Sequence, residues 1–173
     1  MRVHRANFLC LLALAAAMLL VSPAAATTAR PADSVRPALA AGVLTKLNAI
    51  RVSHKLVPLV VDKQLTAAAL EPSKEMLARG YFSHDSFDGS SYAKRITRHY
   101  RKGKVGENLL WSSPDVGAAR ALVLWMGNAG HREAILDPRW RVIGIGAVHS
   151  ARAPGKYGGR ATTVVTTDFG ARR

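Results

Sequence analysis

Three side chains that can bind metal ions or move protons, His84, Glu107 and His131, lie far apart in the chain beside apolar or aromatic neighbours. Neutral imidazoles are good ligands for Zn²⁺ and similar ions, and a glutamate can accept a hydrogen bond from a histidine N–H and so fix its tautomer. Two histidine ligands alone would leave coordination positions open to water, so we expect weak metal binding. The same three groups could instead activate a water molecule for hydrolysis.

Each of these residues also has a purely structural interpretation. His84 lies in a loop rich in Asp and Ser and could cap a turn. Glu107 could accept backbone N–H groups near a helix start, and His131 could cap the helix before it. Their spacing contains no local metal motif such as His-Glu-x-x-His, so spacing alone does not bring them together. No serine or cysteine nucleophile is apparent, because Ser83 is adjacent to His84 only in sequence.

Helices are predicted for most of the first two thirds of the domain. Apolar residues at helical spacing predict a helix over 39–57, and Pro58 ends it. A second helix is predicted from Asp62, which can cap its free N–H groups, to Arg79, with a kink or a break at Pro72. A third is predicted from Ser90 or Ser91 through His99, after an aromatic-rich loop.

The last third of the chain predicts a helix, a turn and a hairpin. Ser113-Pro114-Asp115 is typical of a helix start, and this helix should run to Met126. A tight turn and one further helical turn then carry His131. Residues 141–150 and 162–169 alternate like strands and should pair as a hairpin. The order predicts an α+β fold, in which helices cover a small antiparallel sheet.

The N-terminus has the pattern of an export signal. A basic start, an apolar run and small residues predict a signal peptide over 1–26, followed by a flexible leader over 27–38 and one domain over 39–173. A retained N-terminal anchor is the alternative. The single cysteine, Cys10, lies in the apolar run, so the mature domain has no disulfide and we expect its packed core to stabilise it.

The chain is strongly basic, with a formal net charge of +14. For an exported protein, the available polyanions are cell-wall polymers, anionic lipid head groups and acidic glycans, so we expect one of these and no nucleic acid as the partner. A solvated cationic surface without a specific partner is equally compatible with the scattered charges. We expect a monomer.

Several short motifs occur together in a fixed order: Asn48-x-x-Arg51, Tyr81-Phe82-Ser83-His84, Gly106-Glu107-Asn108-Leu109, Trp125-Met126 with Gly130-His131-Arg132, Ile143-Gly144-Ile145-Gly146, and Asp168-Phe169-Gly170. In this order they resemble the bacterial branch of the CAP superfamily, named for cysteine-rich secretory proteins, antigen 5 and pathogenesis-related 1. The resemblance covers residues 42–170, and the ordered set is specific although no single motif is.

This resemblance implies an α-β-α sandwich with a cleft lined by two histidines and usually two glutamates. His84, Glu107 and His131 match three of these positions, and Asn128 occupies the fourth. The asparagine weakens any acid–base scheme that needs two carboxylates. Glu133 is close in sequence but should point away from His131. In some members the histidines bind a divalent cation, so His84 and His131 are the expected ligands of a metal such as zinc.

Three functions are compatible with these features. The first is a secreted, non-catalytic binding domain whose cleft recognises a cell-envelope, lipid or peptide ligand. The second is a metal-assisted hydrolase, either a peptidase or a wall-acting enzyme, that uses His84, His131 and Glu107. The third is a structural envelope protein whose cleft has no ligand.

Overall fold

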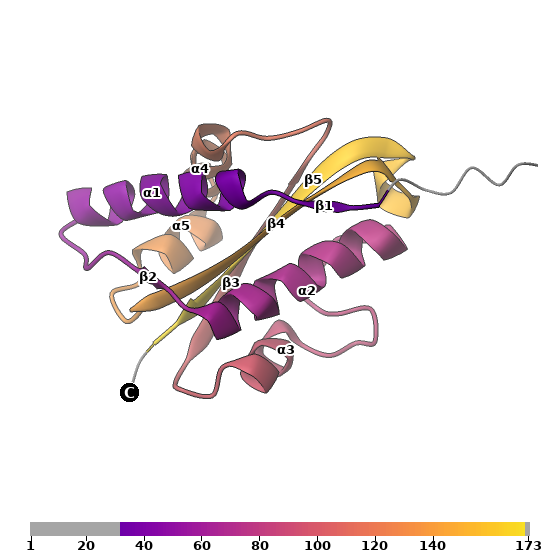
Figure 1. Ribbon diagram of the computed structural model, residues 1–173. Helices are drawn as coiled ribbons and strands as arrows, with labels where there is room; N and C mark the ends of the chain where they lie inside the picture. Colours follow the sequence, from indigo (N-terminus) through magenta and orange to yellow (C-terminus); the bar gives the residue numbers. More distant parts are fainter. Residues whose placement is uncertain (1–31, 172–173) are drawn as a thin grey trace, which may run out of the picture.

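The fold has three layers, with a sheet between two groups of helices (Figure 1). This computed structural model describes residues 32–171. The helices α1 (Pro37–Ser53), α4 (Ala118–Gly127) and α5 (Ala129–Leu136) lie on one face of the sheet, and α2 (Lys63–Arg79) and α3 (Tyr92–His99) on the other. The predicted α+β class and the α-β-α sandwich are therefore confirmed.

The sheet is built on the predicted hairpin. β4 (Val142–Ala153) and β5 (Arg160–Gly170) pair antiparallel, with the short helix η1 (Gly155–Tyr157) between them. β3 (Val105–Ser112) pairs antiparallel with β5 and forms one edge. Two short strands share the outer edge of β4: β1 (Ser34–Val35) is antiparallel to it, and β2 (Val60–Val61) is parallel. The sheet is thus mainly but not wholly antiparallel.

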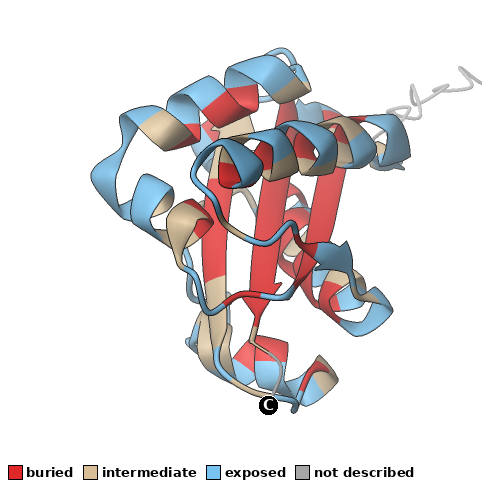
Figure 2. Cartoon of the chain, turned by 90° about the vertical axis from the view of Figure 1, so that its left-hand side faces the viewer, coloured by how far each residue is buried: buried red, intermediate tan, exposed pale blue. Residues whose placement is uncertain are grey.

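The central strands are buried on both faces (Figure 2). One apolar cluster, which includes Leu47, Trp125 and Ile143, lies under α1, α4 and α5. Two smaller clusters, around Met76 and Ile96, lie under α2 and α3. Because both faces are covered, the central strands are almost continuously buried rather than alternating with exposed residues, and β5 buries several threonines and Asp168.

One helix start and one of the two alternatives predicted at Pro72, a break of the helix, were wrong. The fourth helix begins at Ala118 and not at Ser113, because the carboxylate of Asp115 accepts from Thr163 Oγ1 at 2.7 Å and binds Arg36 at 2.9 Å, which ties this segment to the sheet and to the residue after β1. The second helix is not divided at Pro72: the proline is buried within one continuous helix, where packing offsets the lost backbone bond.

Other boundaries differ by less. The turn that carries His131 is a helix of eight residues rather than one turn. Residues 34–38 lie in the range predicted as leader, but they form β1 and the start of α1. The predicted signal peptide and Cys10 lie outside the described residues. Within residues 32–171, no helix is both long and apolar enough to cross a membrane.

Candidate functional site

The site is built around the carboxylate of Glu107, which lies on β3 with its side chain fully buried. One oxygen, Oε1, lies 2.8 Å from His84 Nδ1. The other, Oε2, accepts a hydrogen bond from the guanidinium of Arg95, which is also buried. Since burying a carboxylate is costly unless it is paired and hydrogen-bonded, the pairing with Arg95 offsets the cost of burying Glu107.

Arg95 also holds the loop that carries His84. Its Nη1 donates to the backbone oxygen of His84 at 3.0 Å and to Ser86 Oγ at 3.1 Å. Arg95 comes from α3, which begins as predicted after Ser91, whose side chain accepts from the N–H of Lys94. The sequence predicts the helix that carries Arg95 but not its pairing with Glu107.

His131 is positioned from two sides by asparagines. The N–H of His131 donates to Asn128 Oδ1 at 3.1 Å, so Asn128 is the N-cap of α5. The side chain of Asn108, on β3, donates to the backbone oxygen of His131 at 3.0 Å. Burial lowers the pKa of the His131 imidazole, and the nearby His84 lowers it further. His131 is therefore neutral at pH 7, as a metal ligand or hydrogen-bond acceptor must be.

The cleft is a hollow of about 370 Å³ that brings the sequence-predicted residues together, and it is lined by His84, Tyr92, Glu107, Asn108, Asn128, Gly130, His131 and Ala134. The side chain of His84 is 49% exposed, whereas that of Glu107 is fully buried. The ring of Tyr92 lies 5.9 Å from that of His84. Glu133 lines a neighbouring hollow instead, as its predicted direction requires.

A second carboxyl group lies behind the site. Asp168 is fully buried on β5 and pairs across the strands with Glu107. Burial raises the pKa of Asp168 well above its usual value, and the negative charge of Glu107 raises it further. A carboxyl group that stays neutral does not need a charged partner, and neither oxygen of Asp168 has a hydrogen-bond partner within the described part of the chain. This contact was not predicted from the sequence, although Asp168 is an acid in a run of inward-facing strand residues.

The donor set fits a weak divalent-metal site. The contact with Glu107 at Nδ1 of His84 leaves Nε2 as the nitrogen available for a ligand. His131 is neutral and lines the same hollow. Residues 32–171 contain no group of three or more His, Cys, Asp or Glu side chains placed to hold a metal. Any ion would therefore depend on the two histidines and on water.

Comparison with known proteins identifies the fold and its relatives. The family described as "CAP: Cysteine-rich secretory protein family" matches residues 44–167. The chain is 31% identical over 109 residues to the uncharacterized protein YkwD of Bacillus subtilis, covering 62% of this chain and 42% of YkwD. It is 32% identical over 105 residues to the uncharacterized membrane protein YlbC of the same organism, covering 60% of this chain and 30% of YlbC.

A solved structure agrees with this assignment. It is an extracellular protein containing a SCP domain from Bacillus anthracis, with a TM-score of 0.63 and 27% identity, matched over 79% of this chain and 41% of that one. This chain spans less than half the length of each of these three relatives. The match is therefore to one part of longer proteins.

Proposed function

This chain belongs to the CAP family of cysteine-rich secretory proteins, and on that premise we propose that it is a non-catalytic binding domain that acts outside the cytoplasm. Its ligand enters the cleft between His84 and His131. The ligand is a peptide or another component of the cell envelope.

The observation that carries this proposal is that the carboxylate of Glu107 is buried and held in place. A general base must reach the water or hydroxyl that it activates, whereas the side chain of Glu107 is fully buried. Both oxygens of Glu107 already accept, one from Arg95 and the other from the ring of His84. Asn128, at the position where the family commonly has a second glutamate, caps α5. The arrangement supports a rigid cleft that recognises a ligand rather than one that transfers protons.

Two observations support a location outside the cytoplasm. Residues 1–26 have the pattern of an export signal. The relatives are described as an extracellular protein in Bacillus anthracis and a membrane protein in Bacillus subtilis.

A divalent cation, if bound, would be held by His84 and His131. It would supply positive charge for an anionic group of the ligand. Glu107 would hold the ring of His84 in one orientation and keep its Nε2 directed away from the buried carboxylate.

The metal proposal is tested by calorimetric titration of the purified domain with Zn²⁺. We expect weak binding that His84→Ala and His131→Ala each reduce by about tenfold or more, as expected for the loss of one of two ligands. His54→Ala removes an exposed histidine at the end of α1 and serves as the matched control. Isotherms that are the same for all three variants and the unmodified domain would show that the metal site is wrong.

The absence of catalysis is tested separately. The domain is incubated with a peptide library and with cell-wall polymer, with and without Zn²⁺, and the products are examined by mass spectrometry. We expect saturable binding without products. Turnover that His131→Ala abolishes would contradict the proposal in favour of a hydrolase.

A further inference from the structure

β3 is an edge strand, and part of its edge is open. Ala171 N–H donates to the oxygen of Lys104, so residue 104 faces β5. In an antiparallel ladder the facing direction alternates, so the N–H and C=O groups of Val105 and Glu107 point away from β5. The oxygen of Leu109 points the same way and accepts from Trp125 Nε1 at 2.9 Å, which confirms the alternation and closes the edge at that residue.

The open groups can be reached from solvent. The side chain of Glu107 is 0% exposed, whereas the residue as a whole is 8% exposed. The accessible surface of Glu107 is therefore its backbone. Within residues 32–171, no partner is found for the outward backbone groups of Val105 or Glu107.

A groove runs along this open edge. It is a hollow of about 530 Å³ with α3 on one side, represented by Tyr92 and Thr97, and α5 on the other, represented by Glu133. Gly106 lies on its floor, where a side chain would come within 2.9 Å of the ring of Trp140. The groove shares Tyr92 and Glu107 with the cleft of the two histidines, so the two hollows are continuous.

We propose that an extended peptide segment of another protein binds in this groove as an additional strand on β3, through the backbone of Val105 and Glu107. This proposal rests on the proposed binding function and names the ligand class. The open N–H and C=O groups of alternate strand residues are complementary to the backbone of an extended peptide. Such strand addition is a common form of peptide recognition. Pairing stops at Leu109, so the segment continues past Glu107 toward His84 and His131.

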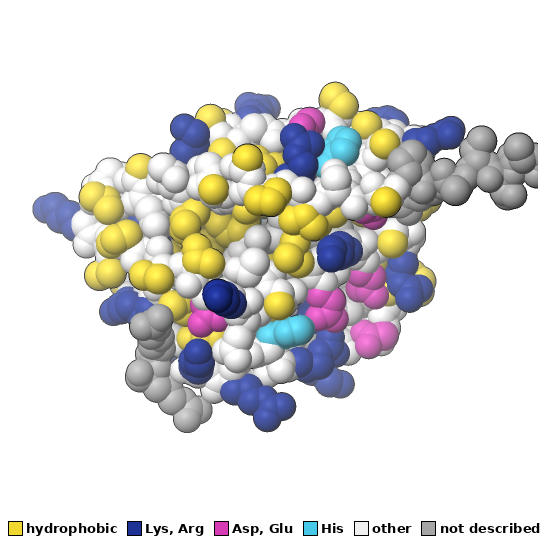
Figure 3. All heavy atoms as spheres, in the orientation of Figure 1, with side chains coloured by type: hydrophobic (Ala, Val, Ile, Leu, Met, Phe, Trp, Pro, Cys, Tyr) yellow, Lys and Arg dark blue, Asp and Glu magenta, His cyan; other side chains and the backbone are white. Residues whose placement is uncertain are grey.

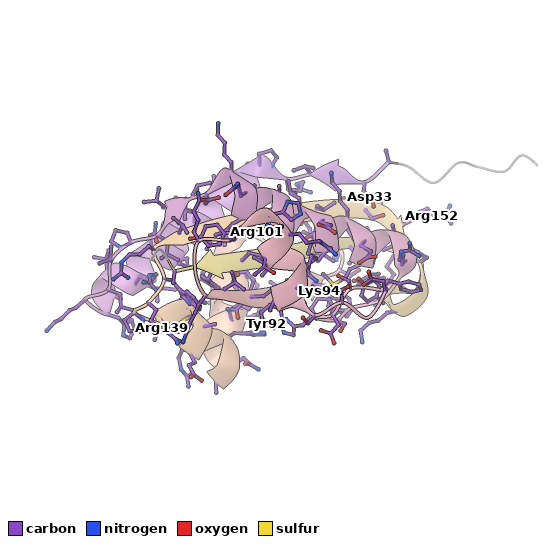
Figure 4. All side chains as sticks on the ribbon, turned by 90° about the horizontal axis from the view of Figure 1, so that it is seen from below. Asp33, Tyr92, Lys94, Arg101, Arg139 and Arg152 are labelled. Atoms are coloured by element: carbon purple, nitrogen blue, oxygen red, sulfur yellow. The ribbon has the colours of Figure 1, made fainter. Side chains whose placement is uncertain are left out.

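The shape of the groove selects a single strand. The edge is recessed between α3 and α5, so a second copy of the sheet cannot approach it edge to edge without meeting the helices. The exposed, basic Lys104 lies at the start of the paired segment and forms no ion pair within the described residues. An acidic residue at this end of the peptide would complement it. Figure 4 shows this underside of the molecule, with Tyr92 between Arg139 and Lys94.

The test uses a proline that removes one outward donor. Val105→Pro deletes the outward N–H at the first residue of an edge strand, where proline is tolerated, and leaves the β3–β5 ladder intact. Val105→Ala shortens the same side chain but keeps the N–H and is the matched control. Thermal unfolding of both variants checks that they fold.

The probe is a phage-displayed library of random ten-residue peptides, selected on the full domain and resynthesised. We expect the selected peptide to bind Val105→Pro at least about fivefold more weakly than Val105→Ala, which is the loss of about one hydrogen bond. N-methylation along the peptide should weaken binding at alternate residues only, since every second N–H faces β3.

Several results would overturn strand addition. They are a selection that recovers no peptide, equal affinity of the two Val105 variants, or N-methylation effects without alternation. Binding that His131→Ala abolishes but Val105→Pro leaves unchanged would keep the cleft function and reject the strand. A Val105→Pro variant that converts a dimer to a monomer would instead assign the edge to a second copy.

Discussion

At the scale of single residues, the site is organised by one buried charge. The buried carboxylate of Glu107 pairs with Arg95 inside the fold, and the contact of Glu107 with Nδ1 orients the ring of His84. Asp168 lies next to this network and cannot also ionise, since two adjacent buried carboxylates would repel. The histidines and Glu107 could be selected from the sequence through the family resemblance. The sequence does not identify Arg95 and Asp168 as site residues, because the residues that they contact come from elements distant in the sequence.

Asp168→Asn should raise the free energy of unfolding at pH 7. The pKa of Asp168 is raised in the folded state, so folding at neutral pH takes up a proton that the unfolded chain does not hold. Each unit by which the folded pKa exceeds the unfolded one lowers the stability at neutral pH by about 1.4 kcal/mol. Asparagine is neutral in both states and has nearly the same shape. The gain should disappear as the pH falls toward about 4, where the unfolded aspartate is also protonated.

Urea unfolding between pH 4 and pH 7.5 measures this difference. Asp88→Asn is the control, because Asp88 is exposed and its pKa is lowered by hydrogen bonds from Ser90, so its replacement should not stabilise the protein at neutral pH. If Asp168→Asn destabilised the domain equally at every pH, Asp168 would be an ionised partner in the network and not a neutral acid.

At the scale of elements, close packing of α2 on β4 sets the position of the sheet. A side chain at Gly144 would overlap the backbone of Leu65, and one at Gly146 would overlap that of Ala69. The alternation of glycine with Ile143 and Ile145 places the glycines on the α2 face and the large residues on the α1 face. This pairing of small and large residues brings α2 against the strands.

Gly144→Ala should therefore destabilise the domain by about 1–3 kcal/mol, because the added methyl group meets backbone that cannot move aside. Gly127→Ala is the matched control: it lies at the end of α4 with nothing within 4 Å of the added atom, so we expect no loss, or a gain of up to about 1 kcal/mol. Thermal or urea unfolding compares the two. If Gly144→Ala lost less stability than Gly127→Ala, this would show that α2 can shift away from β4.

The sequence predicts those elements whose local apolar pattern matches the way in which they pack in the fold. The hairpin and the first three helices have periodic apolar faces, although the first helix ends at Ser53, before the Pro58 that was predicted to end it. The sequence does not predict β3, because Glu107 and Asn108 break its apolar run, and both serve the site. The helix start at Ser113 was wrong because Asp115 binds Thr163 and Arg36, which no local pattern reveals.

At the scale of the whole molecule, charge is scattered over the surface. Basic side chains are spread around the face shown in Figure 3 and do not form one dense patch. The formal net charge is +14, so any polyanion is attracted to the protein. Salt weakens this attraction, because at 0.1 M ionic strength exposed charges more than about 10 Å apart are largely screened from each other. General attraction must therefore be distinguished from recognition at the groove.

Two triple variants with equal loss of charge make this distinction. Lys94→Gln, Arg101→Gln and Lys104→Gln remove exposed basic residues near the groove, whereas Arg120→Gln, Arg152→Gln and Lys156→Gln remove exposed ones elsewhere. We expect the first set to weaken binding of poly-L-glutamate several-fold more than the second, measured by fluorescence anisotropy at low and at high NaCl concentration. The difference should shrink at the higher salt concentration, because exposed charges are screened. Equal losses would mean that net charge alone attracts the polymer and that the groove has no preference for acidic segments.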